Sequence, residues 1–292
     1  MKNHIKGLLS ITISAFCFAV LATLGILLFK GGANPETILT GRFAIATLLF
    51  FLTIILKDTK LFWIEKMDIK WFLLLGLILF VQIITYWYGL QIIKTVSIQV
   101  GLFFTYPIWL AILTPLILRE KLNKLILFSI GYGLMGVLLV LGIIPNGVSY
   151  APFVGVLLAL ATAVIWAMYY AGSQLLSRRY HLLTILFYNF LFNFVAFSFL
   201  QPISVTLSQV TLSVFWYILA LAFVSTYLAY GFLQYAIKLN GVVVVGIHNM
   251  IQPVFAIIIA FLVLNQTMTF YQAIGSAIII SNIYLLNRWR VN

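Results

Sequence analysis

The sequence predicts an all-α integral membrane protein, and three observations support this prediction. Hydrophobic residues make up 64% of the 292 positions and charged residues only 8%, whereas soluble domains are roughly a quarter charged. Apolar runs of about twenty residues recur along the whole chain, and each is long enough to cross a hydrocarbon core of roughly 30 Å. The basic residues stand mainly at the ends of these runs. We therefore expect a polytopic helical protein.

The apolar runs predict ten transmembrane helices. Their ranges are 5–29, 36–56, 70–93, 96–118, 124–143, 152–174, 182–200, 212–236, 242–264 and 270–288. The first run resembles a signal peptide but is too long for one, so we interpret it as the first span. The connections are short apart from 57–69 and 201–211, and no segment has the composition of a soluble domain.

The positions of lysine and arginine predict that both termini face the cytoplasm, because basic residues are enriched in cytoplasmic loops. With ten spans, all but three of the 17 basic residues fall on that side, the exceptions being Lys30, Arg42 and Lys94. A different number of spans would destroy this alternation. The net charge of +12 follows from this topology. Because the basic residues form no continuous stripe, we expect no nucleic-acid partner.

An internal repeat divides the chain into two predicted domains, residues 1–146 and 147–292. The residues that recur at a constant offset of 146 are Pro107 and Pro253, Glu120 and Gln266, Ser129 and Gly275, and Gly136 and Asn282. Each half holds five predicted spans. Because five is odd, the second half is expected to be inverted relative to the first, as in many secondary transporters.

These features resemble the EamA-type branch of the drug/metabolite transporter superfamily. The resemblance rests on the two five-helix halves, on Trp166-Ala167 in the sixth span, and on the spacing of the motif that follows Pro107. It covers nearly the whole chain. Two positions depart from the family pattern, since Gln266 replaces an acidic residue and Ser129 a common glycine. The resemblance implies a central substrate cavity between the halves that opens alternately to each side. The family includes exporters of amino acids and related metabolites, and importers in some lineages.

The acidic residues argue against one transport mechanism. All five lie in loops or at span ends: Glu36, Asp58, Glu65, Asp68 and Glu120. A charged group near the bilayer centre is costly and is kept where it binds an ion or relays protons. The small multidrug transporters of the same superfamily use an intramembrane glutamate for this purpose. We therefore do not expect an obligate proton/cation drug antiporter of that kind.

Polar residues beside a proline form the first candidate substrate site. In the ninth span, His248, Asn249 and Gln252 precede Pro253, and a helix-breaking proline there would free the backbone carbonyl of Asn249. His248 is interpreted either as a substrate or proton ligand or as a histidine hydrogen-bonded to a neighbouring helix. The equivalent part of the first half carries Gln99, Tyr106 and a second helix-breaking proline, Pro107.

Aromatic residues inside the spans form the second candidate site. They are Tyr86 in the third span, Trp166 and Tyr169 in the sixth, and Tyr227 and Tyr230 in the eighth. A Tyr hydroxyl or Trp N–H at depth requires a partner, and aromatic faces can hold an ammonium group by cation–π contact. These residues therefore either line a cavity or pack between helices.

Arg42 lies about one and a half turns into the second span. Its long side chain can reach outward to the membrane surface, and we interpret it as an interfacial anchor. The alternative is a cation near the outer mouth that attracts a substrate carboxylate.

The leading functional hypothesis is a secondary transporter or facilitator in the cell inner membrane. It would move a small metabolite, an amino acid or related amphipathic compound, by alternating access, with export favoured. The sequence has no Walker motif, and no G-x-S-x-G or H-E-x-x-H, so an enzyme is not expected. With one cysteine and three scattered histidines, neither a cofactor nor a metal site is expected.

A channel-like protein or a structural membrane partner is the alternative, and an intramembrane enzyme is a weaker one. The expected partners are a small-molecule substrate and the lipid bilayer. The oligomeric state is open, with a monomer as the working expectation.

Overall fold

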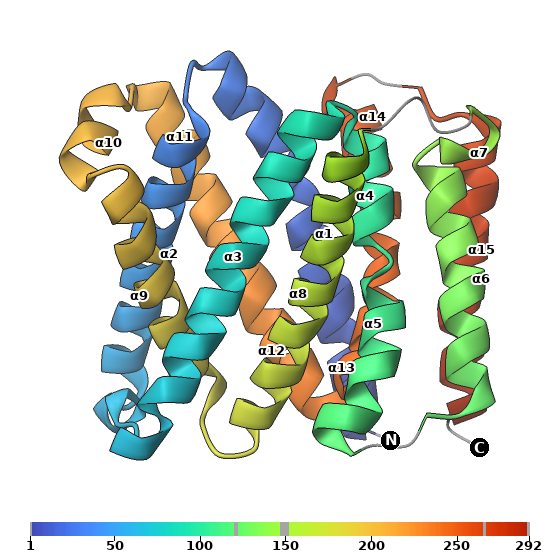
Figure 1. Cartoon of the computed structure of the whole chain (residues 1–292), viewed down its shortest axis with the longest axis horizontal. Coiled ribbons are helices and arrows are strands. Elements are labelled where there is room, and N and C mark those ends of the chain that lie inside the picture. Colours follow the sequence, from blue (N-terminus) through green and yellow to red (C-terminus); the bar gives the residue numbers. More distant parts are fainter. Residues whose placement is uncertain (1, 120–121, 147–151, 265–266, 291–292) are drawn as a thin grey trace.

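Helices alone build the part of the chain that the structure describes, which in this computed structural model is residues 2–119, 122–146, 152–264 and 267–290. The predicted all-α class is therefore confirmed. Helix α1 begins and helix α15 ends at the same end of the bundle (Figure 1). Of the repeat motif, Glu120 and Gln266 lie outside the described residues.

Each half of the chain supplies one series of helices. The first half contains α1 (Lys2–Lys30), α2 (Pro35–Lys57), η1 (Thr59–Phe62), η2 (Lys66–Asp68), α3 (Ile69–Ile93), α4 (Val96–Phe103), α5 (Tyr106–Leu113), η3 (Thr114–Leu118), α6 (Lys124–Val140) and α7 (Ile143–Asn146). The second contains α8 (Phe153–Ser177), α9 (Leu182–Leu200), α10 (Ile203–Gln209), α11 (Leu212–Ala222), η4 (Phe223–Leu228), α12 (Ala229–Asn240), α13 (Val242–His248), η5 (Asn249–Ile251), α14 (Gln252–Leu264) and α15 (Phe270–Arg290).

Eight helical stretches within the described ranges are long and apolar enough to cross a membrane, by length and composition. They coincide with eight of the ten predicted spans. The other two predicted spans correspond to α6 and α15. Helix α6 has 17 residues, or about 26 Å of helix at 1.5 Å per residue, which is at the lower limit for a span. A total of ten spans stays a prediction.

Local sequence explains where two of these helices begin. The side chain of Asn34 caps α2 by accepting a hydrogen bond from the Thr37 backbone N–H at 2.7 Å, and Pro35 follows at the first helical position. Asn123 caps α6 in the same way, accepting from the Ile126 N–H at 2.9 Å. Asparagine at the N-cap satisfies one of the free N–H groups of a helix start. The polar residues between the apolar runs therefore end one helix and start the next.

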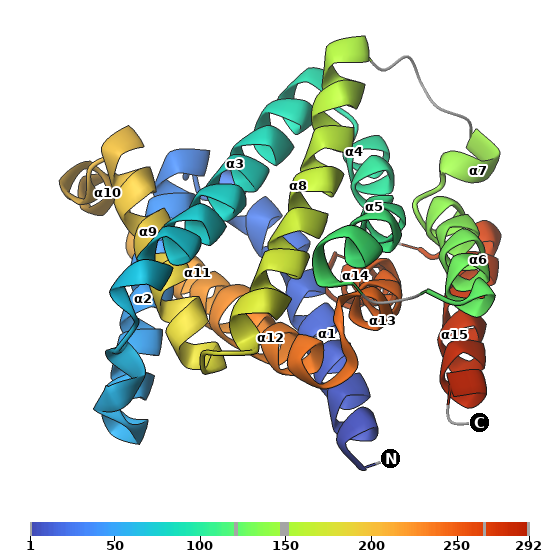
Figure 2. The same cartoon turned by 60° about the horizontal axis from the view of Figure 1, so that its bottom comes forward.

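The packing of the two halves on one another has a two-fold pattern. In chain order α1 corresponds to α8, α2 to α9, α3 to α11–α12, α4–α5 to α13–α14, and α6 to α15. Helix α3 packs along α8, and the corresponding pair, α12 and α1, packs in the same way. Helices α2 and α6 each pack along their own counterparts, α9 and α15 (Figures 1 and 2). A pseudo-two-fold axis between two repeats gives this arrangement.

The contact between α6 and α15, side by side at the right of Figure 1, shows the same symmetry at the level of single residues. Gly136 faces Gly275, and the Asn282 side-chain amide donates to the Ser129 carbonyl at 2.9 Å. The repeat offset of 146 relates Gly136 to Asn282 and Gly275 to Ser129, so each of these two contacts is the symmetry counterpart of the other. The glycines let the helices approach closely, since a Cβ on Gly275 would lie 2.6 Å from the Gly136 carbonyl oxygen.

We predict that Gly275→Ala lowers the apparent melting temperature of the purified protein in detergent. The new methyl group must push the α6 backbone away, and overpacking of this kind costs about 1–3 kcal/mol. Gly131→Ala in α6 is the matched control, because a Cβ there meets no atom within 4 Å. It should be neutral or slightly stabilising, as alanine is the better helix former. Equal effects of the two substitutions would contradict the close α6–α15 contact.

The connection between α8 and α9 is joined to η2 by polar contacts. The Tyr180 hydroxyl donates to the Asp68 carboxylate at 2.7 Å, and the Arg179 guanidinium lies 3.5 Å from the same oxygen. Burial and the bond to Asp68 raise the pKa of Tyr180. His181 caps α9, because its Nδ1 accepts from the Leu183 backbone N–H at 3.2 Å. Burial, and then the positive charges of Lys57 and Lys238, lower the pKa of His181.

We predict that His181→Asn reduces the loss of thermal stability on acidification. The cap requires neutral His181, whose pKa in the folded protein lies below the ordinary value of 6.5. Its contribution is therefore complete above pH 6.5 and is lost as the pH falls through the folded-state pKa. Asparagine caps a helix at any of these pH values. Melting temperatures at about pH 7 and pH 5 should therefore differ less in the variant, and an unchanged difference would contradict the capping role.

Candidate substrate cavity

Two proline-containing helix breaks lie at corresponding places in the halves. Helix α4 ends at Phe103, and α5 begins at Tyr106 with Pro107 as its second residue. Helix α13 ends at His248, and α14 begins at Gln252 with Pro253 second. Proline has no N–H to continue a preceding helix but is well tolerated in a first turn. Both predicted helix-breaking prolines therefore stand directly after an interruption.

The second interruption is closed more tightly than the sequence led us to expect. The Gln252 backbone N–H donates to the Asn249 carbonyl, within the 3₁₀ turn η5. The carbonyl that Pro253 was expected to free is therefore satisfied inside the turn. In an α-helix the Asn249 carbonyl would accept from residue 253, which is a proline and has no N–H. In a 3₁₀ turn the same carbonyl accepts from residue 252 instead, so the proline leaves it satisfied. This break therefore contributes the side chains of Asn249 and Gln252, and not a free carbonyl, to the centre of the bundle.

A cavity of 170 Å³ lies between the two halves at the level of these breaks. The elements around it are α1, α2, α3, α4, α8, α12 and the turn leading into α14. Its lining residues are Phe18, Leu21, Arg42, Gln82, Ile83, Tyr86, Trp87, Val100, Phe103, Phe104, Trp166, Tyr230, Asn249 and Gln252. Half of the lining residues are aromatic, and the wall also holds one arginine and three amide side chains. An ordered water needs about 10–15 Å³ of such space, so the cavity has room for a small metabolite.

Five of the ten predicted substrate-binding residues line this cavity. They are Tyr86, Trp166, Tyr230, Asn249 and Gln252. They come from four separate helical segments and from both halves of the chain. The structure thus brings together the residues beside the second proline and the aromatic residues of three spans.

Gln99 and Tyr106 are buried behind the wall, where they position it. The Gln99 side-chain amide donates to the Tyr86 backbone carbonyl at 3.3 Å, which fixes α4 against α3. The Tyr106 hydroxyl donates to the Gly246 carbonyl at 2.9 Å, which joins the two interrupted helical segments across the halves. Neither residue lines the cavity. Their contacts set the shape of the site.

Tyr169 and Tyr227 are also outside the lining. The Tyr169 hydroxyl accepts from the Asn189 side-chain amide at 2.9 Å, and its ring stacks on Trp166 with 5.1 Å between centroids. Tyr169 therefore supports a cavity residue from behind. The Tyr227 hydroxyl lies 2.8 Å from the Thr53 hydroxyl near the end of α2. Tyr227 lies away from the cavity in this structure, and its role in substrate binding stays a prediction.

His248 is buried in the wall and turned toward α15. Its Nε2 lies 3.2 Å from the Asn287 side-chain nitrogen, and His248 is not among the cavity-lining residues. Of the two interpretations from sequence, this geometry favours the histidine that bonds a neighbouring helix. Its role as a substrate or proton ligand stays a prediction.

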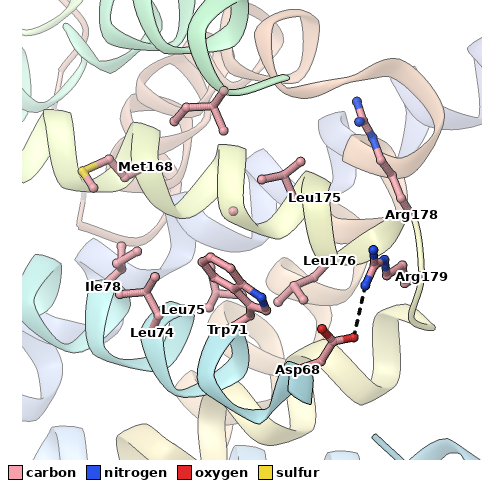
Figure 3. Close-up of a pocket in the computed structure, with 12 residues that line it drawn as sticks. Asp68, Trp71, Leu74, Leu75, Ile78, Met168, Leu175, Leu176, Arg178 and Arg179 are labelled. Atoms are coloured by element: carbon pink, nitrogen blue, oxygen red, sulfur yellow. Dashed lines mark ion pairs between the residues drawn. The ribbon is translucent and has the colours of Figure 1, made fainter. Parts of the chain in front are cut away.

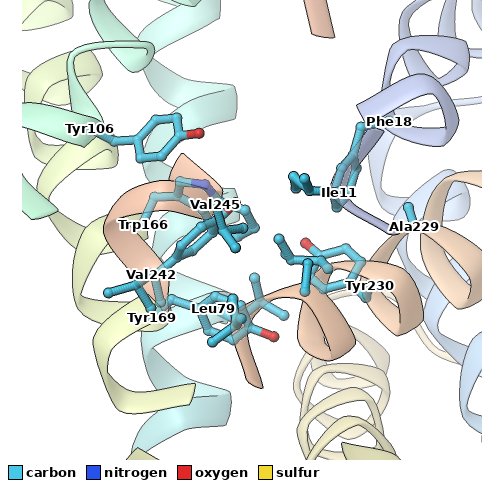
Figure 4. Close-up of a cluster of buried hydrophobic side chains, with 14 of the residues drawn as sticks. Ile11, Phe18, Leu79, Tyr106, Trp166, Tyr169, Ala229, Tyr230, Val242 and Val245 are labelled. Carbon is cyan, nitrogen blue, oxygen red and sulfur yellow. The ribbon is translucent and has the colours of Figure 1, made fainter. Parts of the chain in front are cut away.

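A layer of buried aromatic and apolar side chains lies beside the cavity (Figure 4). Trp166 contacts Tyr170 and Tyr230 edge-on, at 5.2 and 6.1 Å between centroids. Val242 and Val245, at the start of α13, add fully buried side chains to this layer. Helices α13 and α1 both begin at one end of the bundle (Figure 1). The layer therefore extends from the cavity wall to residues at the start of α13, near that end.

Arg42 is the one charged residue of the cavity wall, and its position corrects our interpretation as an interfacial anchor. Its side chain is only 8% exposed. The Nε–H donates to the Thr226 hydroxyl at 2.6 Å, and Nη2 donates to the Ser225 carbonyl at 3.3 Å. The side chain therefore points inward to residues 223–228 of the second half instead of outward to the membrane surface.

The residues that hold Arg42 belong to a π-helical turn, η4. Such turns carry one extra residue and change which carbonyls and side chains a helix presents, and they are frequent at functional sites. The Ser225 hydroxyl also donates to the Cys17 carbonyl at 2.8 Å, which fixes η4 to α1. The π turn therefore places a carbonyl and a hydroxyl where the guanidinium of Arg42 needs acceptors.

Sequence reasoning left Arg42, Gln82, Trp87 and Phe103 out of the predicted site, although all four line the cavity. The signal for Arg42 was a cation inside an apolar run, which by default marks a functional position. Gln82 is a polar residue deep in a span. Trp87 belongs to the aromatic run Tyr86-Trp87-Tyr88 of the third span, whereas Phe103 carries no sequence signal that distinguishes it from a packing residue.

A larger groove of 500 Å³ lies on the outside of the bundle between α3 and α8 (Figure 3). The Asp68–Arg179 ion pair stands at one end of it. Its apolar wall includes Trp71, which is 51% exposed, and Leu74, which is 44% exposed. The polar residues of this groove, Asp68, Arg178 and Arg179, all lie at that one end, whereas polar side chains of α2, α3 and the second helix break line the central cavity. The central cavity is therefore the better candidate for substrate binding.

Comparisons with known proteins agree with this fold. The model of the EamA-like transporter family matches residues 5–142 and again residues 153–288. One solved crystal structure superposes with a TM-score of 0.80 over 98% of each chain, at 20% sequence identity, a likeness that shows the fold alone. No functionally curated protein matches significantly.

The family model covers both halves of the chain, which confirms the resemblance read from the sequence motifs. This protein is therefore a member of the EamA-like transporter family, a multi-pass membrane protein of a class that moves small molecules.

Proposed function

We propose that this protein is a secondary transporter or facilitator that moves a small amphipathic metabolite, such as an amino acid, through the central cavity by alternating access. The observation that carries the proposal is the cavity itself. It lies between the two halves, it is walled by residues of both, and buried polar and aromatic groups converge on it. Pockets with a few placed polar groups in an apolar wall are typical small-molecule sites.

The chemistry of the wall supports an amphipathic substrate. Aromatic faces such as those of Tyr86 and Trp166 can hold an apolar side chain, or an ammonium group by cation–π contact. The buried Trp166 Nε1 has no hydrogen-bond partner among the described residues, and such donors usually have an acceptor. The amides of Gln82, Asn249 and Gln252 supply both donors and acceptors. A substrate with an apolar body and a polar end satisfies both parts of this wall.

The symmetry of the packing supports alternating access. We propose that residues 1–146 and 147–292 form two inverted repeats of five spans each, with both termini in the cytoplasm and the protein in the inner membrane. Two such halves can rock around a fixed central site. We propose that the aromatic layer closes the cavity toward the end where α1 begins, which would be the cytoplasmic end. The direction we favour is export, as in the amino-acid exporters of the family.

The cavity wall argues against proton coupling through the protein. No acidic side chain lines the cavity in the part of the chain that the structure describes, and His248 faces α15. We propose that the substrate gradient, or exchange for a second substrate molecule, drives transport. With the aromatic layer closed at the end where α1 begins, no continuous path would run through the bundle. This closure favours a transporter over a channel.

Counterflow in liposomes that contain the purified protein tests the proposal. Labelled amino acids, nucleosides, S-adenosylmethionine and quaternary amines are offered outside, with the same unlabelled compound inside. We predict that the amino acids enter, and that internal unlabelled compound stimulates entry, because exchange through one site requires both faces to open in turn. Silence across the panel, beside a working control transporter, would contradict the proposal. Uptake without stimulation would indicate a channel.

Within the same assay, Trp166→Phe should raise the KM of the transported amino acid roughly 2- to 10-fold, as expected for the loss of one hydrogen bond of about 0.5–1.5 kcal/mol. Phenylalanine keeps a ring in the wall and removes the Nε1 donor. Tyr227→Phe is the matched control, since it removes a hydroxyl bonded to Thr53 outside the cavity. Equal KM values in the two variants, at equal folded yield, would show that Trp166 does not contact substrate.

A further inference from the structure

We infer that Arg42 binds the carboxylate of the transported substrate, and that the substrate class is therefore small amphipathic carboxylates, including zwitterionic amino acids. The inference rests on the proposed transport function and names the substrate chemistry of the same cavity. Arg42 lines the central cavity, is 8% exposed, and belongs to a span that the membrane surrounds.

The first argument is the charge of Arg42, which no acidic side chain balances. The ion pair found among the described residues joins Asp68 to Arg179, at the far end of α3 and α8. The other described acidic residues, Glu36, Asp58 and Glu65, lie at helix ends or in the α2–α3 connection. A buried cation without a counter-charge is strongly unfavourable. Charged residues inside membrane spans mark substrate or ion pathways by default, and a cation in such a pathway attracts an anion.

The second argument is the geometry of the guanidinium. Its partners, the Thr226 hydroxyl and the Ser225 carbonyl, are both neutral, and they engage Nε and one N–H of Nη2. Guanidinium has five N–H donors in a fixed plane. Both N–H groups of Nη1 and the second N–H of Nη2 have no acceptor among the described residues, which leaves the Nη1–Nη2 edge for a ligand. This edge matches the two oxygens of a carboxylate, the most specific pairing that arginine makes.

The third argument is that the protein fixes Arg42 in advance. The π turn η4 presents both acceptors from one short segment, and the Ser225 hydroxyl bonds α1 through the Cys17 carbonyl. Neutral acceptors orient a guanidinium without cancelling its charge. A site prepared in this way binds an anion without first having to order a long side chain.

The rest of the wall describes the body of the substrate. Phe18, Phe103 and Trp166 give apolar surface, and Phe18 and Tyr230 contact one another edge-on at 5.1 Å between centroids. Asn249 and Gln252 lie in the same lining and can accept from an ammonium group. The wall therefore suits one carboxylate attached to an apolar chain. A quaternary amine has no group to offer Arg42 and would meet like charge.

Counterflow with matched compounds tests the assignment. The probes are leucine, leucinamide, which lacks the carboxylate, and 4-methylpentanoate, which lacks the ammonium group; phenylalanine and its carboxamide form a second pair. In the wild-type protein we expect both carboxylates to compete with labelled leucine at least 10-fold better than leucinamide. Arg42→Gln should abolish this preference and raise the KM of leucine about 100-fold.

Two further variants guard against a trivial loss of folding. Arg42→Lys retains the charge but not the planar pair of donors, and should raise the KM of leucine about 10-fold at normal yield. Arg179→Gln removes an arginine that is 73% exposed and lies outside the cavity, and should leave the KM unchanged. These two variants keep the test decisive if Arg42→Gln does not fold.

The outcomes separate this inference from the proposed function. The role of Arg42 would be overturned if the wild-type protein transported leucinamide or quaternary amines as well as leucine. An unchanged carboxylate preference in Arg42→Gln would overturn it too, and in both cases the transport function would still hold. A KM in Arg42→Lys equal to that of the wild type would also overturn it. Failure of every probe and every panel compound would overturn the transport function itself.

Discussion

One buried arginine, held by neutral oxygens, is the constraint on which the centre of this molecule depends. Arg42 is only 8% exposed, and no acidic side chain pairs with it in the described part of the chain. Its position requires the π turn that supplies Ser225 and Thr226, and that turn in turn fixes α11–α12 against α1 and α2. A soluble protein could solvate such a group. In a bilayer the charge of Arg42 must be compensated from within the bundle. An anion bound in the adjacent cavity can compensate it.

The two-fold packing explains how such a site can exist in a protein so poor in polar residues. The main helix pairs between the halves have counterparts, down to the exchange of the Gly136–Gly275 and Ser129–Asn282 contacts in α6 and α15. The same symmetry places two proline-containing breaks face to face, joined by Tyr106 and the Gly246 carbonyl. Side chains beside both breaks then line one cavity, with Phe103 and Phe104 from the first and Asn249 and Gln252 from the second. The cavity is therefore a consequence of the repeat rather than an addition to it.

The fold class could be predicted because run length and charge placement report directly on the membrane solvent. The face on which a residue lies was harder to predict. Tyr227 and Tyr230 are three apart and would share a face of a regular α-helix, but η4 ends between them and its extra residue turns Tyr227 toward Thr53. His248 lies at the right depth and faces α15. The depth of a residue in the membrane can be estimated from sequence. The direction in which its side chain points around the helix depends on turns such as η4 and η5, which no residue pattern predicts.

The most direct measurement of the central claim is a structure of the protein with its transported substrate bound. The account predicts a carboxylate within about 2.7–2.9 Å of the Nη1 and Nη2 atoms of Arg42, with Arg42 still held by Ser225 and Thr226. A substrate seated in the cavity with its carboxylate away from Arg42, or a bound substrate without an anionic group, would contradict the account.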